Sequence, residues 1–146
     1  MTFSDSHVLE LDVEASYDHL EKFANLVEES AHRMGMSEDE EVDLMIAVME
    51  AVNNAILHGN KEDDQKRVWM KIETSESEMM VWVQDEGAGF QRDLLPNPLS
   101  EENLMKESGR GILMMQAFMD EIDFSQNEKG LLVTMKKVFQ TKEKKG

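Results

Sequence analysis

The chain has 146 residues, of which 31 are Asp or Glu and 15 are Lys or Arg, so its formal net charge is -16. This length fits one compact domain with a sizeable core. The negative charge opposes binding to DNA, RNA or an anionic membrane, and it favours a basic protein partner. The sequence contains no cysteine, which excludes disulfides, thiolate metal ligands and cysteine nucleophiles.

The first residues, "MTFSDSHVLELDVEAS", lack the basic and then apolar layout of a signal peptide. No apolar run approaches the roughly 20 residues of a membrane span. We therefore expect a cytoplasmic protein with one domain over residues 1–140 and a basic, flexible tail over residues 141–146. We also expect most of the 13 methionines to be adaptable core residues.

Two helices are predicted after a first strand. Residues 7–13, "HVLELDV", alternate between apolar and polar side chains and predict that strand. Ser16 then predicts the start of a helix that ends at Gly35. Ser37, with Glu40 three residues later, has the form of a capping box and predicts a second helix that ends at Gly59. The apolar positions that we expect this second helix to bury are Val42, Met45, Met49, Val52 and Ile56.

The second half of the chain contains a hairpin, a long connection, a helix and a closing strand. Residues 67–87 predict two strands, with one apolar face made by Val68, Met70, Ile72, Val81 and Val83. Residues 88–111 are rich in Gly, Pro, Ser and charge, and connections of that length are usually functional lids or disordered. A third helix is predicted over residues 112–122, "ILMMQAFMDEI", and a closing strand over residues 130–138.

The order of these elements favours one fold class. The predicted order is strand, helix, helix, strand, strand, loop, helix, strand, strand. This order contains hairpins and too few crossovers for a doubly wound parallel sheet. We therefore predict an α+β fold: a two-layer sandwich with helices on one face of a mostly antiparallel, mixed sheet.

Polar residues interrupt the apolar pattern of the second helix in the segment "EAVNNAILHGN". Glu50 and Asn54 are four residues apart, so they are neighbours on the helix surface, at one edge of the predicted buried stripe. A carboxylate and an amide oxygen beside a cleft suit Mg²⁺. In the same arrangement, the carboxylate could act as a base near a metal-bound phosphate. The alternative is that both are merely solvated residues at a helix boundary.

The segment "QDEGAGF" places glycines directly after a strand. Gly87 and Gly89 allow the backbone to come close to a flat or charged ligand, while the Asp85 carboxylate accepts a hydrogen bond from it. The third glycine of a dinucleotide fingerprint is absent, because Arg92 stands in its place. The alternative is a tight turn with no ligand.

The segment "SGRGILMM" opens the third helix with Gly109 and Gly111. Free backbone N–H groups and the positive end of the helix dipole favour an anion there, and Lys106 and Arg110 add local positive charge. The surface carboxylates are screened beyond about 8 to 10 Å, so the net charge does not exclude a nucleoside triphosphate. The alternative is a hinge at a helix entry.

Taken in order, "EAVNNAILHGN", "DEGAGF", "SGRG" and "KGLLVTMKK" resemble the N, G1, G2 and final-strand motifs of the GHKL ATPase superfamily. The length and the local sequence resemble most closely the branch of bacterial anti-sigma factor serine kinases. The resemblance extends from the first strand to about Val138. It implies the histidine-kinase-type ATPase fold, with ATP and Mg²⁺ as cofactors.

The same resemblance implies roles for individual residues. Glu50 matches the general base, Asn54 the magnesium ligand, and Asp85 the carboxylate that accepts a hydrogen bond from the adenine amino group. Two further parts of the family site have matches in this chain. The base pocket is matched by Gly87 and Gly89. The phosphate-binding turn beneath an ATP lid is matched by Gly109, Arg110 and Gly111.

The function that the resemblance implies is that of an ATP-dependent protein serine kinase acting as an anti-sigma factor. Such a protein binds a sigma factor and phosphorylates a serine of an anti-anti-sigma antagonist, and it is usually a homodimer. One alternative is a nucleotide-binding anti-sigma or adaptor module without phosphoryl transfer. Another is a detached catalytic domain for histidine phosphorylation, which would need a dimerisation helix with a phosphoacceptor histidine.

One position departs from the family pattern. The family usually has Thr where this chain has Leu131, and that hydroxyl joins the water network between the Asp and adenine. Thr134 does not replace it, because an offset of three along a strand turns the side chain to the other face. The lost hydrogen bond predicts an ATP affinity that is lower by roughly fivefold, or about 1 kcal/mol.

Overall fold

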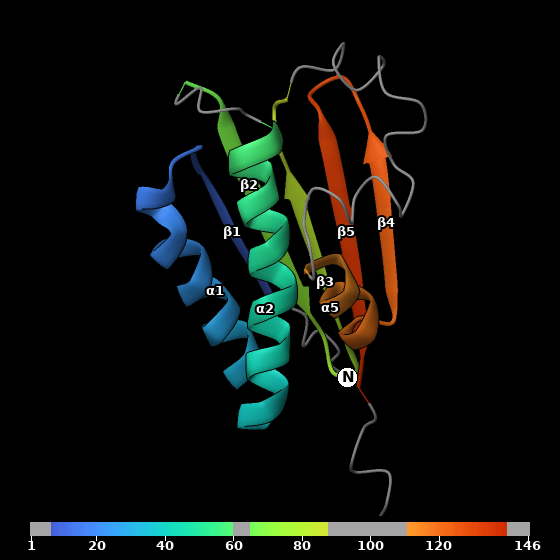
Figure 1. Ribbon diagram of the computed structural model, residues 1–146. Helices are drawn as coiled ribbons and strands as arrows, with labels where there is room; N and C mark the ends of the chain where they lie inside the picture. Colours follow the sequence, from blue (N-terminus) through green and yellow to red (C-terminus); the bar gives the residue numbers. More distant parts are fainter. Residues whose placement is uncertain (1–6, 60–64, 88–110, 140–146) are drawn as a thin grey trace, which may run out of the picture.

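The computed structural model describes residues 7–59, 65–87 and 111–139, and these form a sheet with helices packed on one of its faces (Figure 1). This is the predicted two-layer α+β sandwich. No helix within these residues is long and apolar enough to cross a membrane. The elements are β1 (His7–Glu14), the 3-10 turn η1 (Tyr17–His19), α1 (Leu20–Arg33), α2 (Glu38–Asn54), the π-helical turn η2 (Ala55–Gly59), β2 (Arg67–Thr74), β3 (Glu78–Gln84), α5 (Gly111–Phe118), β4 (Glu121–Gln126) and β5 (Leu131–Val138).

The sheet has five strands in the order β1-β2-β3-β5-β4. Every pairing among the described strands is antiparallel, so the mixed character that we expected is not found in this part of the chain. The central pairing joins β3 to β5 and sets Gln84 opposite Leu132. It therefore brings the residues after β3 next to the turn before β5.

Both predicted ends of the link between α1 and α2 are confirmed. Gly35 has a φ of 71°, and its N–H donates to the carbonyl oxygen of His32 at 3.1 Å. This left-handed residue closes α1 in a way that favours glycine. At the start of α2, the N–H of Glu40 donates to Ser37 Oγ at 3.1 Å, and the N–H of Ser37 donates to Glu40 Oε1 at 3.0 Å. These two reciprocal bonds are the predicted capping box.

Ser16 caps a shorter element than we predicted. Its hydroxyl accepts a hydrogen bond from the N–H of Asp18 at 3.1 Å, within the turn η1, and α1 itself begins at Leu20. The second helix was predicted to end at Gly59, and the helical path does run to that residue, although its last turn is not α-helical. The α-helical part of α2 ends at Asn54 and continues as the π-helical turn up to Gly59.

The third helix is shorter than the predicted span of residues 112–122. It ends at Phe118, and Ile122 already belongs to β4, where it pairs with Met135. The N–H of Asp120 donates to the carbonyl oxygen of Lys136 at 2.8 Å. The backbone of Asp120 and Ile122 thus pairs with β5 and is not available to the hydrogen bonds of a longer helix.

The core lies between the helices and the sheet. All five strand residues predicted to share an apolar face, from Val68 to Val83, are buried. The prediction for α2 was wrong at Val42, which is 55% exposed, whereas Leu44 and Val48 are fully buried. Apolar residues occur around much of this helix, so its periodicity alone did not select the face that packs between α1 and α5. Among the described residues, five methionines are buried in the core, and four more pack against it partly buried. The buried ones are Met70, Met79, Met115, Met119 and Met135, and the partly buried ones are Met34, Met36, Met45 and Met49.

Candidate functional site

The Asp85 side chain is held by the backbone at the end of β3. It is only 3% exposed, and its Oδ1 accepts hydrogen bonds from the N–H of Gly87 at 3.1 Å and from the N–H of Leu131 at 2.8 Å. The N–H of Asp85 donates in turn to the carbonyl oxygen of Leu131 at 3.1 Å. A carboxylate can accept several hydrogen bonds, and this one has a fixed direction.

Gly130 packs against this carboxylate and has to be a glycine. Its φ is 155°, a conformation that side chains rarely adopt. A Cβ at this position would overlap Oδ1 of Asp85, and it would lie 2.8 Å from both the carbonyl oxygen of Asp85 and the nitrogen of Gly87. The turn before β5 therefore fits closely over the residues that follow β3.

Leu131 contributes to the site through its backbone. Its side chain packs against the core, on the helix side of the sheet. Thr134 pairs with Trp82 on the opposite face, as the strand periodicity predicts. Thr134 therefore does not supply the hydroxyl that Leu131 lacks.

Glu50 and Asn54 lie on the last turns of α2, and both are partly buried. Figure 1 places this end of α2 at the same end of the molecule as the end of β3 and the turn between β4 and β5. The helix changes to its π-helical turn directly after Asn54. Such turns are frequent at functional sites. The structure thus brings this pair to the end of the molecule where Asp85 lies, and their roles stay predictions.

The remaining site predictions fall largely outside the described residues. Gly87 is buried beside Asp85, and Gly111 is the first residue of α5. The residues that lie outside the described ranges are Gly89, Lys106, Gly109 and Arg110, together with the predicted lid over residues 88–110 and the tail over residues 141–146. The phosphate-binding turn stays a prediction.

Sequence reasoning missed two residues beside the site, Gln84 and Asn127. The Nδ2–H of Asn127 donates to Gln84 Oε1 at 2.8 Å, across 43 residues of sequence. The local signal was an Asn three residues before a glycine in the turn "NEKG", which is typical of a side chain that bonds to the backbone of its own turn. Its partner in β3 could not be found from spacing.

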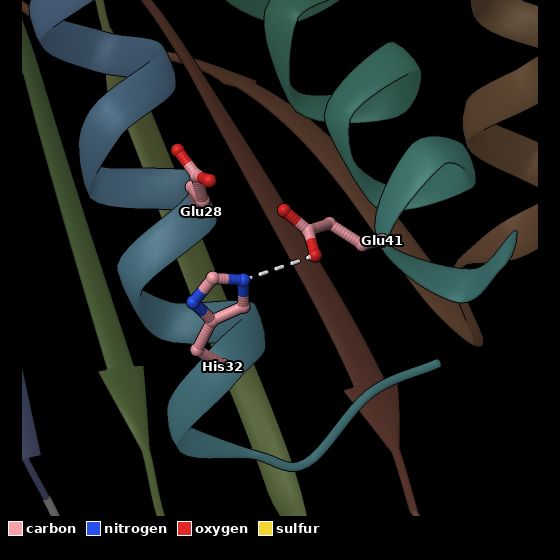
Figure 2. Close-up of side chains that lie close together, drawn as sticks. All are labelled: Glu28, His32 and Glu41. Carbon is pink, nitrogen blue, oxygen red and sulfur yellow. Dashed lines mark ion pairs between the residues drawn. The ribbon is translucent and has the colours of Figure 1, made fainter. Parts of the chain in front are cut away.

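A different group of possible metal ligands joins α1 to α2 (Figure 2). The ligand atoms of Glu28, His32 and Glu41 all lie within 4.8 Å of one another. His32 Nε2 is 3.4 Å from Glu41 Oε1, an ion pair when the imidazole is protonated. Glu41 is in the first turns of α2, at the other end of the helix from Asn54. This group is therefore separate from the predicted magnesium site.

The sheet face away from the helices carries two tryptophans. The indole N–H of Trp69 donates to Glu10 Oε2 at 2.6 Å, and Lys71 Nζ lies 4.9 Å from the ring centroid of Trp82. Both rings line a hollow of about 360 Å³ on this face. They are only partly covered by their polar neighbours.

Comparison with known proteins gives consistent matches. Residues 13–137 match the family described as "Histidine kinase-like ATPase domain". The serine-protein kinase RsbW of Bacillus subtilis (strain 168) is 40% identical over 113 residues, which are 73% of this chain and 70% of that protein. An anti-sigma F factor of Clostridium perfringens (strain 13 / Type A) is 35% identical over 106 residues, which are 70% of this chain and 76% of that protein.

A solved structure supports the fold. It contains the RsbU and RsbW domains of a Mycobacterium tuberculosis protein, and it superposes with a TM-score of 0.65 at 17% identity over 92% of this chain. The match covers 35% of that longer chain. Together with the family match over residues 13–137, these findings show that the chain belongs to the histidine kinase-like ATPase domain family.

Proposed function

We propose that this protein is an ATP-dependent serine kinase that acts as an anti-sigma factor, binding a sigma factor and phosphorylating a serine of an anti-anti-sigma antagonist. The observation that carries the proposal is the buried Asp85 carboxylate, which backbone N–H groups from two distant segments hold in place. The names of the relatives, a serine-protein kinase and anti-sigma factors, support the same reading.

In the proposed site, Asp85 accepts a hydrogen bond from the adenine amino group and so orients the nucleotide. An amide oxygen such as that of Asn54 is a ligand that Mg²⁺ accepts, and the bound ion would neutralise phosphate charge. Glu50 takes the proton from the hydroxyl of the substrate serine while the oxygen of that serine bonds to the γ-phosphorus. The bond from the γ-phosphorus to the bridging oxygen breaks, and ADP is the leaving group.

The experiment that tests this function is a transfer assay with γ-labelled ATP and a candidate anti-anti-sigma protein. We expect label on a serine of that protein, identified by mass spectrometry. Binding of a sigma factor that depends on nucleotide, without any transfer, would instead favour the adaptor module. An acid-labile phosphate on a histidine of the protein incubated alone would favour the histidine kinase alternative.

The charge of the chain supports a protein partner. A net charge of -16 complements a basic protein surface and opposes nucleic acid. We place the protein in the cytoplasm, where sigma factors act.

We also propose a homodimer. Within the described part of the chain, no helix covers the sheet face that bears Trp69 and Trp82, and a second copy would bury these rings further (Figure 1). Light scattering on the purified protein should give a dimer mass, and Trp82→Ser should lower it towards the monomer. A wild-type protein that is monomeric at all concentrations would contradict this arrangement.

A further inference from the structure

Two side-chain amides pair with each other at the end of β3. Gln84 is the last residue of that strand and is only 7% exposed, and Asn127 follows directly after β4. Asn127 Nδ2–H donates to Gln84 Oε1 at 2.8 Å, and Gln84 Nε2–H donates to Asn127 Oδ1 at 3.3 Å. The two amides thus form a head-to-tail pair, which we call the amide pair.

The Asn127 side of the amide pair closes the turn before β5. Its Oδ1 also accepts hydrogen bonds from the N–H of Lys129 at 2.9 Å and of Gly130 at 3.0 Å. The N–H of Asn127 donates to the carbonyl oxygen of Gly130 at 2.8 Å. Gly130 is therefore held by both the side chain and the backbone of Asn127.

The Gln84 side of the amide pair holds the backbone on either side of the site. Its Nε2 also donates to the carbonyl oxygen of Asp85 at 2.7 Å and to that of Leu131 at 3.3 Å, so the two hydrogens of this nitrogen are shared among three acceptors. Gln84 is buried while Asn127 is exposed, so the network runs from the surface into the protein. Removing Asn127 leaves the buried Gln84 Oε1 without this donor, and removing Gln84 leaves the carbonyl oxygens of Asp85 and Leu131 without the Nε2–H bond.

The amide pair holds other backbone groups of the same residues that orient the Asp85 carboxylate. Leu131 supplies the N–H that donates to Oδ1, and Gly130 packs against the same oxygen. Gln84 lines the hollow on the sheet face that bears the tryptophans, together with Trp69. The amide pair thus reaches the backbone of the site from the side away from the helices, and we expect it to make no contact with the nucleotide.

We propose that Gln84 and Asn127 are positioning residues that set the preference of the site for a 6-aminopurine nucleotide. The proposal rests on the proposed function, in which Asp85 accepts a hydrogen bond from the adenine amino group. A carboxylate accepts hydrogen bonds and donates none when ionised, so it discriminates against a 6-oxo group. That discrimination requires a correctly directed carboxylate, and the amide pair supplies the direction.

The test is a pair of calorimetric titrations, with Mg-ATP and with Mg-ITP, which carries a 6-oxo group in place of the amino group. Asn127→Ala removes the turn acceptor, and Gln84→Met replaces the other amide by an apolar side chain of similar size. We expect each variant to bind ATP about tenfold more weakly, with little change for ITP. Because the two amides act as one unit, the double variant should lose little more than either single variant.

A matched control is Gln126→Ala, one residue before Asn127, where the side chain is exposed. It should keep the wild-type ratio of ATP to ITP affinity. Equal losses for both nucleotides, or an unchanged ratio in both variants, would overturn this inference while leaving the proposed function intact. A wild-type protein that binds neither nucleotide would overturn the proposed function and this inference together.

The two variants also guard against a failure to fold. Gln84→Met places an apolar side chain beside Trp69 and Leu132, so it should fold even if the altered turn of Asn127→Ala does not. Circular dichroism before each titration identifies a folded sample, and if Asn127→Ala does not fold, the ratio of the two affinities in Gln84→Met decides the question.

Discussion

The backbone N–H of Leu131 donates a 2.8 Å hydrogen bond to Oδ1 of Asp85, a residue 46 positions earlier in the chain. The bond crosses from β5 to the residue after β3, so the central strand pairing fixes the carboxylate that we assign to adenine. The position of the carboxylate thus depends on the fold of both hairpins.

Replacing Asp85 should abolish nucleotide binding. Asp85→Ala removes the only group of this residue that we expect to contact adenine, and it leaves the N–H groups of Gly87 and Leu131 without this acceptor. Calorimetry with Mg-ATP should detect no binding, and circular dichroism should confirm that the variant folds. Unaltered affinity would contradict the adenine assignment.

Replacing Glu50 should separate binding from transfer. Glu50→Ala removes the proposed base, so we expect ATP affinity to persist while serine phosphorylation falls by about 10² to 10⁴-fold, the usual effect of a general base. Glu50→Gln repeats the test with almost no change in volume. Glu38→Gln, in the exposed first turn of the same helix, is the matched control and should phosphorylate normally. Normal phosphorylation by the Glu50 variants would refute the role.

Replacing Gly130 should damage the site more than replacing Gly35, which also has a positive φ. In Gly130→Ala the new Cβ overlaps Asp85, so the carboxylate has to move and ATP binding should be lost. Strain at such a position costs on the order of 1 to 3 kcal/mol, which thermal unfolding would detect. Gly35→Ala is the control, because its φ is 71° and a Cβ there meets nothing within 4 Å. It should lose stability only, and equal ATP affinity in both variants would argue against the close fit.

Restoring the family hydroxyl at Leu131 should strengthen nucleotide binding. In Leu131→Thr the backbone N–H that holds Asp85 is unchanged, while a hydroxyl is added on the helix side of β5. One added hydrogen bond predicts an affinity that is higher by roughly fivefold. Thr134→Val, on the opposite face of the same strand, should have no effect. If calorimetry gives the same affinity for Leu131→Thr and the wild type, the hydroxyl has no such role here.

The stability of the first strand should depend on pH through Glu14. The pKa of this carboxyl is lowered from 4.5 by a hydrogen bond to its own backbone and by a second one to His19. Because the folded pKa lies below the unfolded value, the stabilisation is complete above the unfolded pKa and is lost as pH falls through the folded pKa. Urea unfolding at pH 7 and below 4 should therefore show Glu14→Gln less stable than the wild type only at the higher pH. A difference that is independent of pH would exclude this linkage.

Local rules account for what the sequence predicted well. The capping box at Ser37 and the glycine closure at Gly35 depend on residues within a few positions, and the alternating strand residues depend on a period of two. Asp85 was selected because a carboxylate that follows a strand and precedes spaced glycines can accept a hydrogen bond from a ligand, and its role stays a prediction. These features need no knowledge of the distant chain.

Long-range packing accounts for the differences. Val42 and Leu44 are both apolar, and only the arrangement of α1, α5 and the sheet decides that Leu44 is buried. The end of α5 depends on the backbone of β5, because the carbonyl oxygen of Lys136 accepts a hydrogen bond from the N–H of Asp120. Gln84 and Asn127 are 43 residues apart, so neither could identify the other as a partner.

The order β1-β2-β3-β5-β4 has a mechanical consequence. The first three strands and the last two meet only at the pairing of β3 with β5, and the Asp85 carboxylate bridges that seam. A nucleotide bound there would fasten the two parts together, so occupancy should slow amide exchange along the seam more than at the outer strands. The energy state of the cell would then influence how long each copy of this protein survives proteolysis.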